Sequence, residues 1–325
     1  MRLRLVPEQT NIDFFSWQGI TFGLSIVAMV LSIAVFLVIG LNYGIDFRGG
    51  SMLMAETVDA VDVGSIREVL NSLSIGDTSV TEISDPAADI TGAAKNAVMI
   101  RIEQVGSDPA IQNDTIVAVK GALEERFAGI QFLATESVGA KVSGELVQAG
   151  IIAVVSAVAA VLFYIWLRFE WQFSVGAVAA LVHDVILTIG VFSIFAIEFN
   201  LSIIAALLTI VGYSLTDTVV VFDRVRENLR KYKSTALVDV LNMSINQTLS
   251  RTLMTSGTTL LALIALYVLG GEVIRGFTFA MIWGVIVGTY SSIFVASSIL
   301  LRLGVKRDWD KNAGAAGTQF ANIDA

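Results

Sequence analysis

Residues 201–222 read LSIIAALLTIVGYSLTDTVVVF, an apolar stretch that carries a carboxylate, Asp217, in its second half. The stretch is long enough to cross the core of a bilayer as a helix. An acid at that depth costs about 3 kcal/mol of insertion free energy, so it is normally kept for ion handling or for a buried pair. The stretch therefore predicts a membrane-spanning helix with a functional or paired acid.

A candidate partner for this acid opens the next apolar stretch. Arg251 stands there, and a stripe of hydroxyl side chains follows it at helical spacing. The stripe consists of Thr252, Thr255, Ser256, Thr258 and Thr259. Removal from water favours the protonated form of a carboxylate, whereas a nearby guanidinium favours the ionised form. The two residues predict a proton or ion path, with a structural ion pair as the alternative.

The composition indicates a membrane protein before any motif is considered. The chain has 325 residues, of which 55% are hydrophobic and 15% charged, and its mean hydropathy is +0.74. Apolar stretches of spanning length occur near 19–41, 147–167, 174–196, 200–222, 252–270 and 277–302. They predict six transmembrane helices. The chain has no cysteine, which excludes disulfides and thiolate metal sites.

The basic residues predict the orientation. Lys and Arg gather at the amino terminus, after the second and fourth spans, and in the tail, and such residues are retained on the cytoplasmic side. We expect a cytoplasmic segment 1–18, a first span 19–41, an outer domain 42–146, five further spans within 147–302 and a cytoplasmic tail 303–325. Apolar residues four apart also predict an amphipathic helix over 234–249, lying on the cytoplasmic surface.

The outer segment is acidic and patterned as a small globular domain. Residues 42–148 hold 7 Lys and Arg against 16 Asp and Glu, which argues against a nucleic-acid partner. Alternation predicts strands at 52–57, 78–84, 98–103 and 130–138, and helical periodicity predicts helices at 63–73 and 110–127. This βαββαβ order is ferredoxin-like. Phe132 and Ala134 should share one face of the last strand, and a turn-rich loop is expected at 85–95. No catalytic constellation stands out, so binding or mechanical work is expected.

The segment that leaves the first span carries a family resemblance. Gly44-Ile45-Asp46-Phe47-Arg48-Gly49-Gly50 resembles the signature of the SecD/SecF family of translocase subunits, distant members of the resistance-nodulation-division (RND) superfamily. We assign five of its positions, Gly44, Asp46, Phe47, Gly49 and Gly50, a structural role, as a glycine-rich exit turn with Asp46 and Arg48 on one side of an extended strand, with coupling of the outer domain to the membrane-spanning part as the alternative. His183-Asp184 and the stretches 212–218, 221–228 and 247–252 resemble the SecF type of subunit.

The resemblance implies a fold, partners and roles. The six helices would form half of an RND-type transporter, with a periplasmic domain between helices one and two, in the bacterial inner membrane. It implies SecD, the SecYEG channel, YajC and a translocating preprotein as partners, and use of the proton motive force to assist polypeptide export. Asp217 and Arg251 would lie in the proton path, with Asp184, Tyr213 and Thr255 as further candidates. We expect no catalytic residue, metal or cofactor; the coupling ion is the proton, with sodium as an alternative.

Three other readings of the same residues stay open. A purely structural assembly subunit would use its intramembrane charges only to hold a partner. An intramembrane protease would pair Asp184 with Asp217, but such a dyad needs two acids at about 3 Å. A drug-efflux half-transporter would be expected to carry a larger outer domain with a binding cleft.

Overall fold

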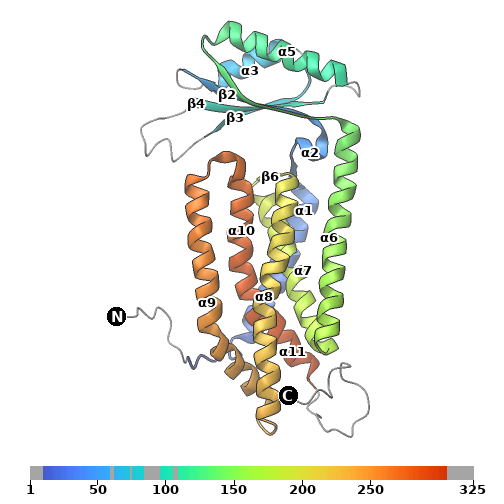
Figure 1. The fold of residues 1–325 in the computed structure, drawn as a ribbon, viewed down its shortest axis with the longest axis vertical. Helices are drawn as coiled ribbons and strands as arrows, with labels where there is room; N and C mark the ends of the chain where they lie inside the picture. The colour runs from blue at the N-terminus through green and yellow to red at the C-terminus, as the bar shows by residue number, and fades with distance from the viewer. Residues whose placement is uncertain (1–9, 59–61, 74, 84–95, 105–108, 306–325) are drawn as a thin grey trace, which may run out of the picture.

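The protein consists of a helix bundle with a small α/β domain at one end (Figure 1). A computed structural model describes residues 10–58, 62–73, 75–83, 96–104 and 109–305. The sequence-predicted loop at 85–95 and most of the tail 303–325 lie outside these residues, as do positions 1–9 of the amino-terminal segment.

Among the residues that the structure describes, six helices are long and apolar enough to cross a membrane, as predicted. They are α1 (Gln18–Ile39), α6 (Ala140–Arg168), α7 (Trp171–Ile194), α8 (Leu201–Lys231), α9 (Leu237–Leu269) and a composite sixth helix made of α10 (Glu272–Ser291), the π-helical turn η1 (Ser292–Ala296) and α11 (Ser297–Leu303). The π-helical turn is accompanied by a hydrogen bond from Ser297 Oγ to the Ser292 carbonyl, five residues earlier.

The prediction of a separate surface helix at 234–249 is wrong. Helix α9 runs without a break from Leu237 to Leu269. The apolar residues of its first turns, Val240, Leu241 and Ile245, are buried in one cluster with Val225 and Leu229 of α8. The apolar face of this segment therefore packs against another helix and not against a lipid surface.

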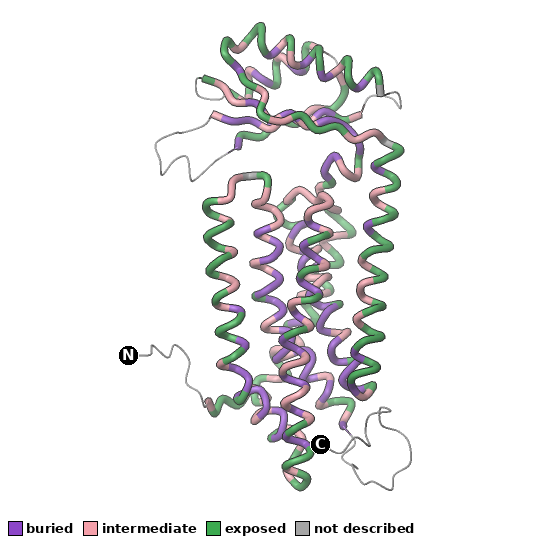
Figure 2. The backbone as a smooth tube through the Cα atoms, in the orientation of Figure 1, coloured by how far each residue is buried: buried purple, intermediate pink, exposed green. Residues whose placement is uncertain are grey.

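The helices divide into an inner and an outer set (Figure 2). Within the most apolar window of each helix, 56% of α7, 44% of α8 and 67% of the sixth helix is buried, against 11%, 6% and 11% of α1, α6 and α9. Small residues allow the inner helices to approach closely. A Cβ added at Gly284 of α10 would lie 2.3 Å from Ile210 of α8, so a larger residue cannot be accommodated there without movement.

The α/β domain has the predicted βαββαβ order. Its elements are β2 (Gly50–Thr57), α3 (Val63–Ser72), β3 (Thr78–Ile83), β4 (Asn96–Glu103), α5 (Pro109–Arg126) and β5 (Gln131–Val138). The strands form one antiparallel sheet in the order β3-β4-β2-β5. Both helices cover the face of the sheet turned away from the bundle (Figure 1), and residues such as Leu53, Ile66 and Leu123 fill the core between them.

One prediction for this sheet is wrong. Ala134 pairs with Met54, but Phe132 pairs with the next residue of β2, Ala55. Met54 and Ala55 are neighbours in β2 and point to opposite faces of the sheet. Their partners Ala134 and Phe132 therefore lie on opposite faces as well. The cause is a β-bulge that inserts Leu133 into the register, and Phe132 thereby packs against the core.

Candidate functional site

Asp217 lies in the interior of the bundle, in the second half of α8. It shares its face with the buried residues Ser214 and Val221, three and four positions away, and is itself 6% exposed. Its Oδ2 accepts a long hydrogen bond, 3.5 Å, from Ser256 Oγ of α9. Ser256 Oγ lies 2.7 Å from Thr289 Oγ1 of α10. Hydroxyl groups from two helices thus extend from the carboxylate across the bundle.

Arg251 is not ion-paired with Asp217 among the residues that the structure describes. The guanidinium is near enough to act on the carboxylate electrostatically, but the direct partner of Asp217 is Ser256. The helix geometry explains why Arg251 and Asp217 are not in contact as an ion pair. Arg251 precedes Ser256 by five residues, a rotation of about 140° around α9, and therefore points to another face. Arg251 itself is exposed, and the buried residue one turn before Ser256 is Thr252.

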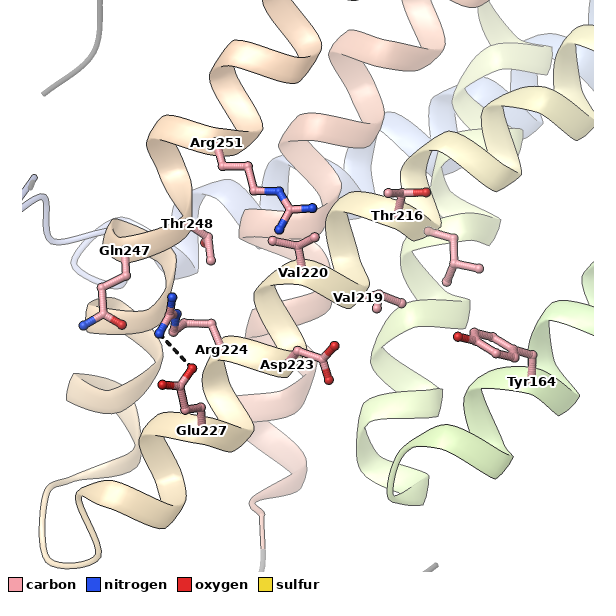
Figure 3. Close-up of a pocket in the computed structure, with 11 residues that line it drawn as sticks. Tyr164, Thr216, Val219, Val220, Asp223, Arg224, Glu227, Gln247, Thr248 and Arg251 are labelled. Atoms are coloured by element: carbon pink, nitrogen blue, oxygen red, sulfur yellow. Dashed lines mark hydrogen bonds and ion pairs between the residues drawn. The ribbon is translucent and has the colours of Figure 1, made fainter. Parts of the chain in front are cut away.

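Arg251 instead faces a cavity between α6, α8 and α9 (Figure 3). This cavity has a volume of about 540 Å³ and lies along the half of α8 that is distant from the α/β domain. Tyr164, Thr216 and Asp223 also line it. Two ion pairs stand at this end of the bundle: Arg168 to Asp223 at 3.2 Å, and Arg224 to Glu227 at 2.7 Å. The cavity is large enough for several water molecules.

Asp184 has very different surroundings. This α7 carboxylate is 1% exposed, and its Oδ2 accepts hydrogen bonds from Ser214 Oγ of α8 at 2.6 Å and Ser291 Oγ of α10 at 2.8 Å. Its Oδ1 lies 2.9 Å from His183 Nδ1. The His183 ring stacks on Tyr290, whose hydroxyl lies 2.9 Å from Ser25 Oγ of α1. The cluster joins four helices, and within the described part of the chain His183 Nε2 is buried in it without a partner.

The structure does not place the two other proton-path candidates on Asp217. The Tyr213 hydroxyl donates to Thr259 Oγ1 at 3.4 Å, so it does not orient the carboxylate. Thr255 Oγ1 donates to the Arg251 and Thr252 carbonyls of its own helix. Tyr213 lies on the α8–α9 contact, one turn of α8 from Asp217, whereas the Thr255 side chain is exposed.

The Gly44–Gly50 segment lies at the opposite end of the bundle, and part of it is not extended as predicted. Residues Ile45–Arg48 form one helical turn, α2, which begins after Gly44 and ends at Gly49 with φ +75°. Gly50 has φ +129°, a conformation that side chains disfavour. Asp46 and Phe47 both turn toward the loop between α7 and α8: Asp46 accepts a hydrogen bond from Leu201 N, and the Phe47 ring lies 5.8 Å from that of Phe199.

Sequence reasoning missed the contribution of the sixth span. Thr289, Tyr290 and Ser291 all take part in the two buried clusters. The signal was present as a run of four hydroxyl residues, Thr289-Tyr290-Ser291-Ser292, in an otherwise apolar stretch. Among the residues that the structure describes, no group of His, Cys, Asp and Glu could hold a metal ion.

These features define a class of protein: a polytopic membrane protein with buried carboxylates in its helical core and one α/β domain between its first two spans. Two family profiles match the chain. "Protein export membrane protein SecD/SecF, C-terminal" matches residues 118–306, and "SecD/SecF GG Motif" matches residues 34–53. The chain belongs to the SecD/SecF family of protein-export membrane proteins.

Relatives within the family specify the type of subunit. The chain is 53% identical to the protein translocase subunit SecF of Cereibacter sphaeroides over 324 residues, covering 100% of this chain and 99% of that protein. It is 44% identical to the protein translocase subunit SecDF of Brucella abortus, covering 94% of this chain and 39% of that protein. The chain thus aligns end to end with SecF subunits and with a part of fused SecDF proteins.

Solved structures agree in fold. The crystal structure of SecDF, a translocon-associated membrane protein from Thermus thermophilus, superposes with a TM-score of 0.81 at 31% identity. The match covers 93% of this chain and 40% of that one. A SecDF structure in a form called super-membrane-facing gives a TM-score of 0.64 at 34% identity, over 93% of this chain. The chain spans about two fifths of the length of these solved proteins.

Proposed function

We propose that this chain is the SecF-type half of a proton-driven protein-export machine, with Asp217 as the group that takes up and releases the proton. The observation that carries the proposal is the setting of Asp217. The carboxylate is buried and has one long hydrogen bond among the described residues, and its chain neighbour Thr216 lines the cavity that Arg251 faces. A group with few fixed partners can change its protonation state at little cost to the fold.

The proposed path has three parts. The cavity at the end distant from the α/β domain admits water and protons as far as Arg251. Asp217 then exchanges a proton with this side, and the approach or retreat of the Arg251 guanidinium favours its ionised or its neutral form. Ser256 and Thr289 continue the path across the bundle. The membrane potential supplies about 2.3 kcal/mol per charge per 100 mV to drive the cycle. Sodium is the alternative coupling ion.

Exposure of the outer helices supports a partner half. Arg251, Thr255 and Thr258 are exposed on α9, although α9 is apolar enough to span a membrane. Exposed polar groups at this depth are stable against another protein or a watery crevice, not against lipid. SecD and SecF are joined in one chain in the SecDF relatives, so SecD is the proposed occupant of this face. The SecYEG channel, YajC and the exported polypeptide complete the proposed assembly.

The proposed orientation follows the basic residues, with both termini on the cytoplasmic side of the inner membrane. The α/β domain, whose βαββαβ order we assign to the ferredoxin-like type, is then periplasmic. The segment 42–146 would act on the exported chain by motion, and the protein would be an accessory subunit rather than an enzyme. Asp184 and Asp217 have separate hydrogen-bond partners in the described structure, which disfavours a protease dyad.

Proton conductance of vesicles containing the chain together with its SecD partner tests the proposal. Asp217→Asn and Arg251→Met should each abolish the conductance and the proton-driven export, while the complex still purifies intact. Asp239→Asn is the matched control, because Asp239 is an exposed acid at the foot of α9, and it should leave both unchanged. Conductance that persists in both test variants would refute the path. Loss of the complex would instead favour the assembly-subunit reading.

A further inference from the structure

The loop between α7 and α8 is held by segments from elsewhere in the chain. Its strand β6 (Glu198–Phe199) pairs in parallel with β1 (Asn42–Tyr43), just after the first span. Gly44 N donates to the Phe199 carbonyl at 2.9 Å, and Asn42 Nδ2 donates to the Ala196 carbonyl at 2.9 Å. The segment that follows α1 is therefore fixed to the segment that precedes α8 by main-chain hydrogen bonds and by one side-chain hydrogen bond.

The first turn of α8 is capped from outside its own helix. The first amide of a helix has no partner within the helix, and Leu201 N donates to Asp46 Oδ2 at 2.9 Å. A carboxylate at this position also interacts favourably with the positive end of the helix dipole. Asn200 completes the cap by accepting from Ile203 N. Asp46 thus connects the helical turn α2 to the start of α8. The α/β domain begins directly after α2.

An ion pair makes a second connection at the same loop. Arg101 of β4 is on the sheet face opposite α3 and α5, and its guanidinium pairs with Glu198 of β6. Both side chains are about one-fifth exposed, and burial lowers the pKa of Arg101 from its ordinary value. A guanidinium that has lost much of its water depends strongly on its carboxylate partner. A cavity of about 350 Å³ adjoins Arg101, and Asn42, Gly44 and Asp77 also line it.

Gly44 makes room for this connection. A Cβ added at Gly44 would lie 2.5 Å from Glu198 Oε1, the same carboxylate that binds Arg101. A side chain at position 44 would therefore displace Glu198. The first glycine of the Gly44–Gly50 segment is explained by the ion pair, and the aspartate of the same segment by the cap on α8.

We propose that Arg101 and Asp46 are positioning residues that make the α/β domain and α8 move as one unit. This inference rests on the proposed function in one respect, which is that α8 carries Asp217. Leu201 and Asp217 are separated by roughly 24 Å along the helix, and an α-helix transmits an axial displacement over such a length. A shift of α8 that accompanies proton uptake would then displace the domain, and a load on the domain would act on α8.

A distance measurement tests the mechanical link without reference to protons. The chain has no cysteine, so Glu124→Cys on α5 and Ala205→Cys on α8 introduce unique, exposed labelling sites. Spin labels at these sites, in the complex with a cysteine-free partner, should give one narrow distance distribution. Arg101→Met and Glu198→Gln should each broaden it, and the charge-reversed double variant R101E/E198R should restore it. A distribution equally narrow in all variants would overturn the inference.

Export measured in the same complexes gives the functional readout. Arg101→Met, Glu198→Gln and Asp46→Ala should each lower proton-driven export about tenfold with the complex intact. Arg126→Met is the matched control: Arg126 is an exposed arginine of the same domain, and its replacement should change neither export nor distance. Full export by all three variants would refute the link. If the distances broaden as expected while Asp217→Asn still conducts, the proposed proton path fails and the link stands.

Discussion

The two buried carboxylates of the bundle differ in how completely they are bonded. Among the residues that the structure describes, Asp184 receives two short hydrogen bonds from hydroxyl groups and lies beside His183, whereas Asp217 has one bond of 3.5 Å. A carboxylate that has hydrogen-bond partners on both oxygens, here called saturated, fixes the helices that surround it. Each partner would be left unsatisfied if the carboxylate changed its protonation state. A weakly bonded one is free to change. We therefore propose that Asp184 holds the inner helices together and that Asp217 is the titrating group.

The largest expected effect comes from removal of the saturated carboxylate. Asp184→Leu should lower the stability of the folded chain by about 3 kcal/mol, because the buried hydroxyls of Ser214 and Ser291 lose their acceptor. Asp217→Leu should cost less than half as much. Thermal unfolding of the purified variants in detergent measures both. Equal losses would erase the distinction between the two sites.

An overpacked helix contact should disturb both sites together. Gly284→Val places a side chain where even a Cβ would lie 2.3 Å from Ile210, and should destabilise the protein by about 2 kcal/mol. It should also weaken function, since α10 supplies hydroxyls to both clusters. Gly257→Val on α9 is the control, because a Cβ there would meet no atom of the described residues within 4 Å apart from its chain neighbours and the backbone of its own helix. Unchanged unfolding of the Gly284 variant would contradict the close packing of α8 and α10.

Single hydroxyl deletions sharpen the comparison. Ser291→Ala removes a 2.8 Å bond to Asp184 and should cost about 1 kcal/mol, while Ser256→Ala removes a 3.5 Å bond to Asp217 and should cost less than half of that. Proton conductance should show the opposite order, with the Ser256 variant the more impaired. Reversed rankings in the unfolding and conductance measurements would assign the roles of the two acids the other way round.

The smallest effect concerns a carboxylate in water. At the start of α3, Ser65 Oγ and Gly64 N both donate to Asp62, and the Ser65 bond is the main cause that lowers the pKa of Asp62 below its ordinary value. The ionised form therefore contributes stability that is full above the ordinary pKa and is lost as the pH falls through the lowered one. Hydrogen-exchange protection factors of the α3 amides in the full chain, which are corrected for the intrinsic pH dependence of exchange, should fall slightly in acid, and Asp62→Asn should remove this change. A pH dependence that survives in the variant would disprove the role of the cap.

Several parts of the candidate site could be predicted from local sequence and others could not. Asp217 and Asp184 were recognisable because a charge in an apolar span is costly wherever its neighbours lie. Arg251 was recognisable for the same reason. The direction in which its side chain points could not be predicted, since a contact with Asp217 depends on how α9 is rotated against α8. The bond between Asp46 and Leu201, and the pair of Arg101 with Glu198, join residues about 155 and 97 positions apart, and no periodicity reports such contacts.

The sequence by itself determined six spanning helices and a βαββαβ domain, because insertion into a bilayer and the burial of one face of a strand or helix are decided by each segment's own pattern of apolar residues. It also determined which acids lie at depth. The tertiary structure alone decided that Asp184 is the acid with short hydrogen bonds and that Asp217 is the acid with a long one. Hydrogen bonds require donors and acceptors within about 3 Å, and that distance is set by the mutual rotation and spacing of helices, which only their packing establishes.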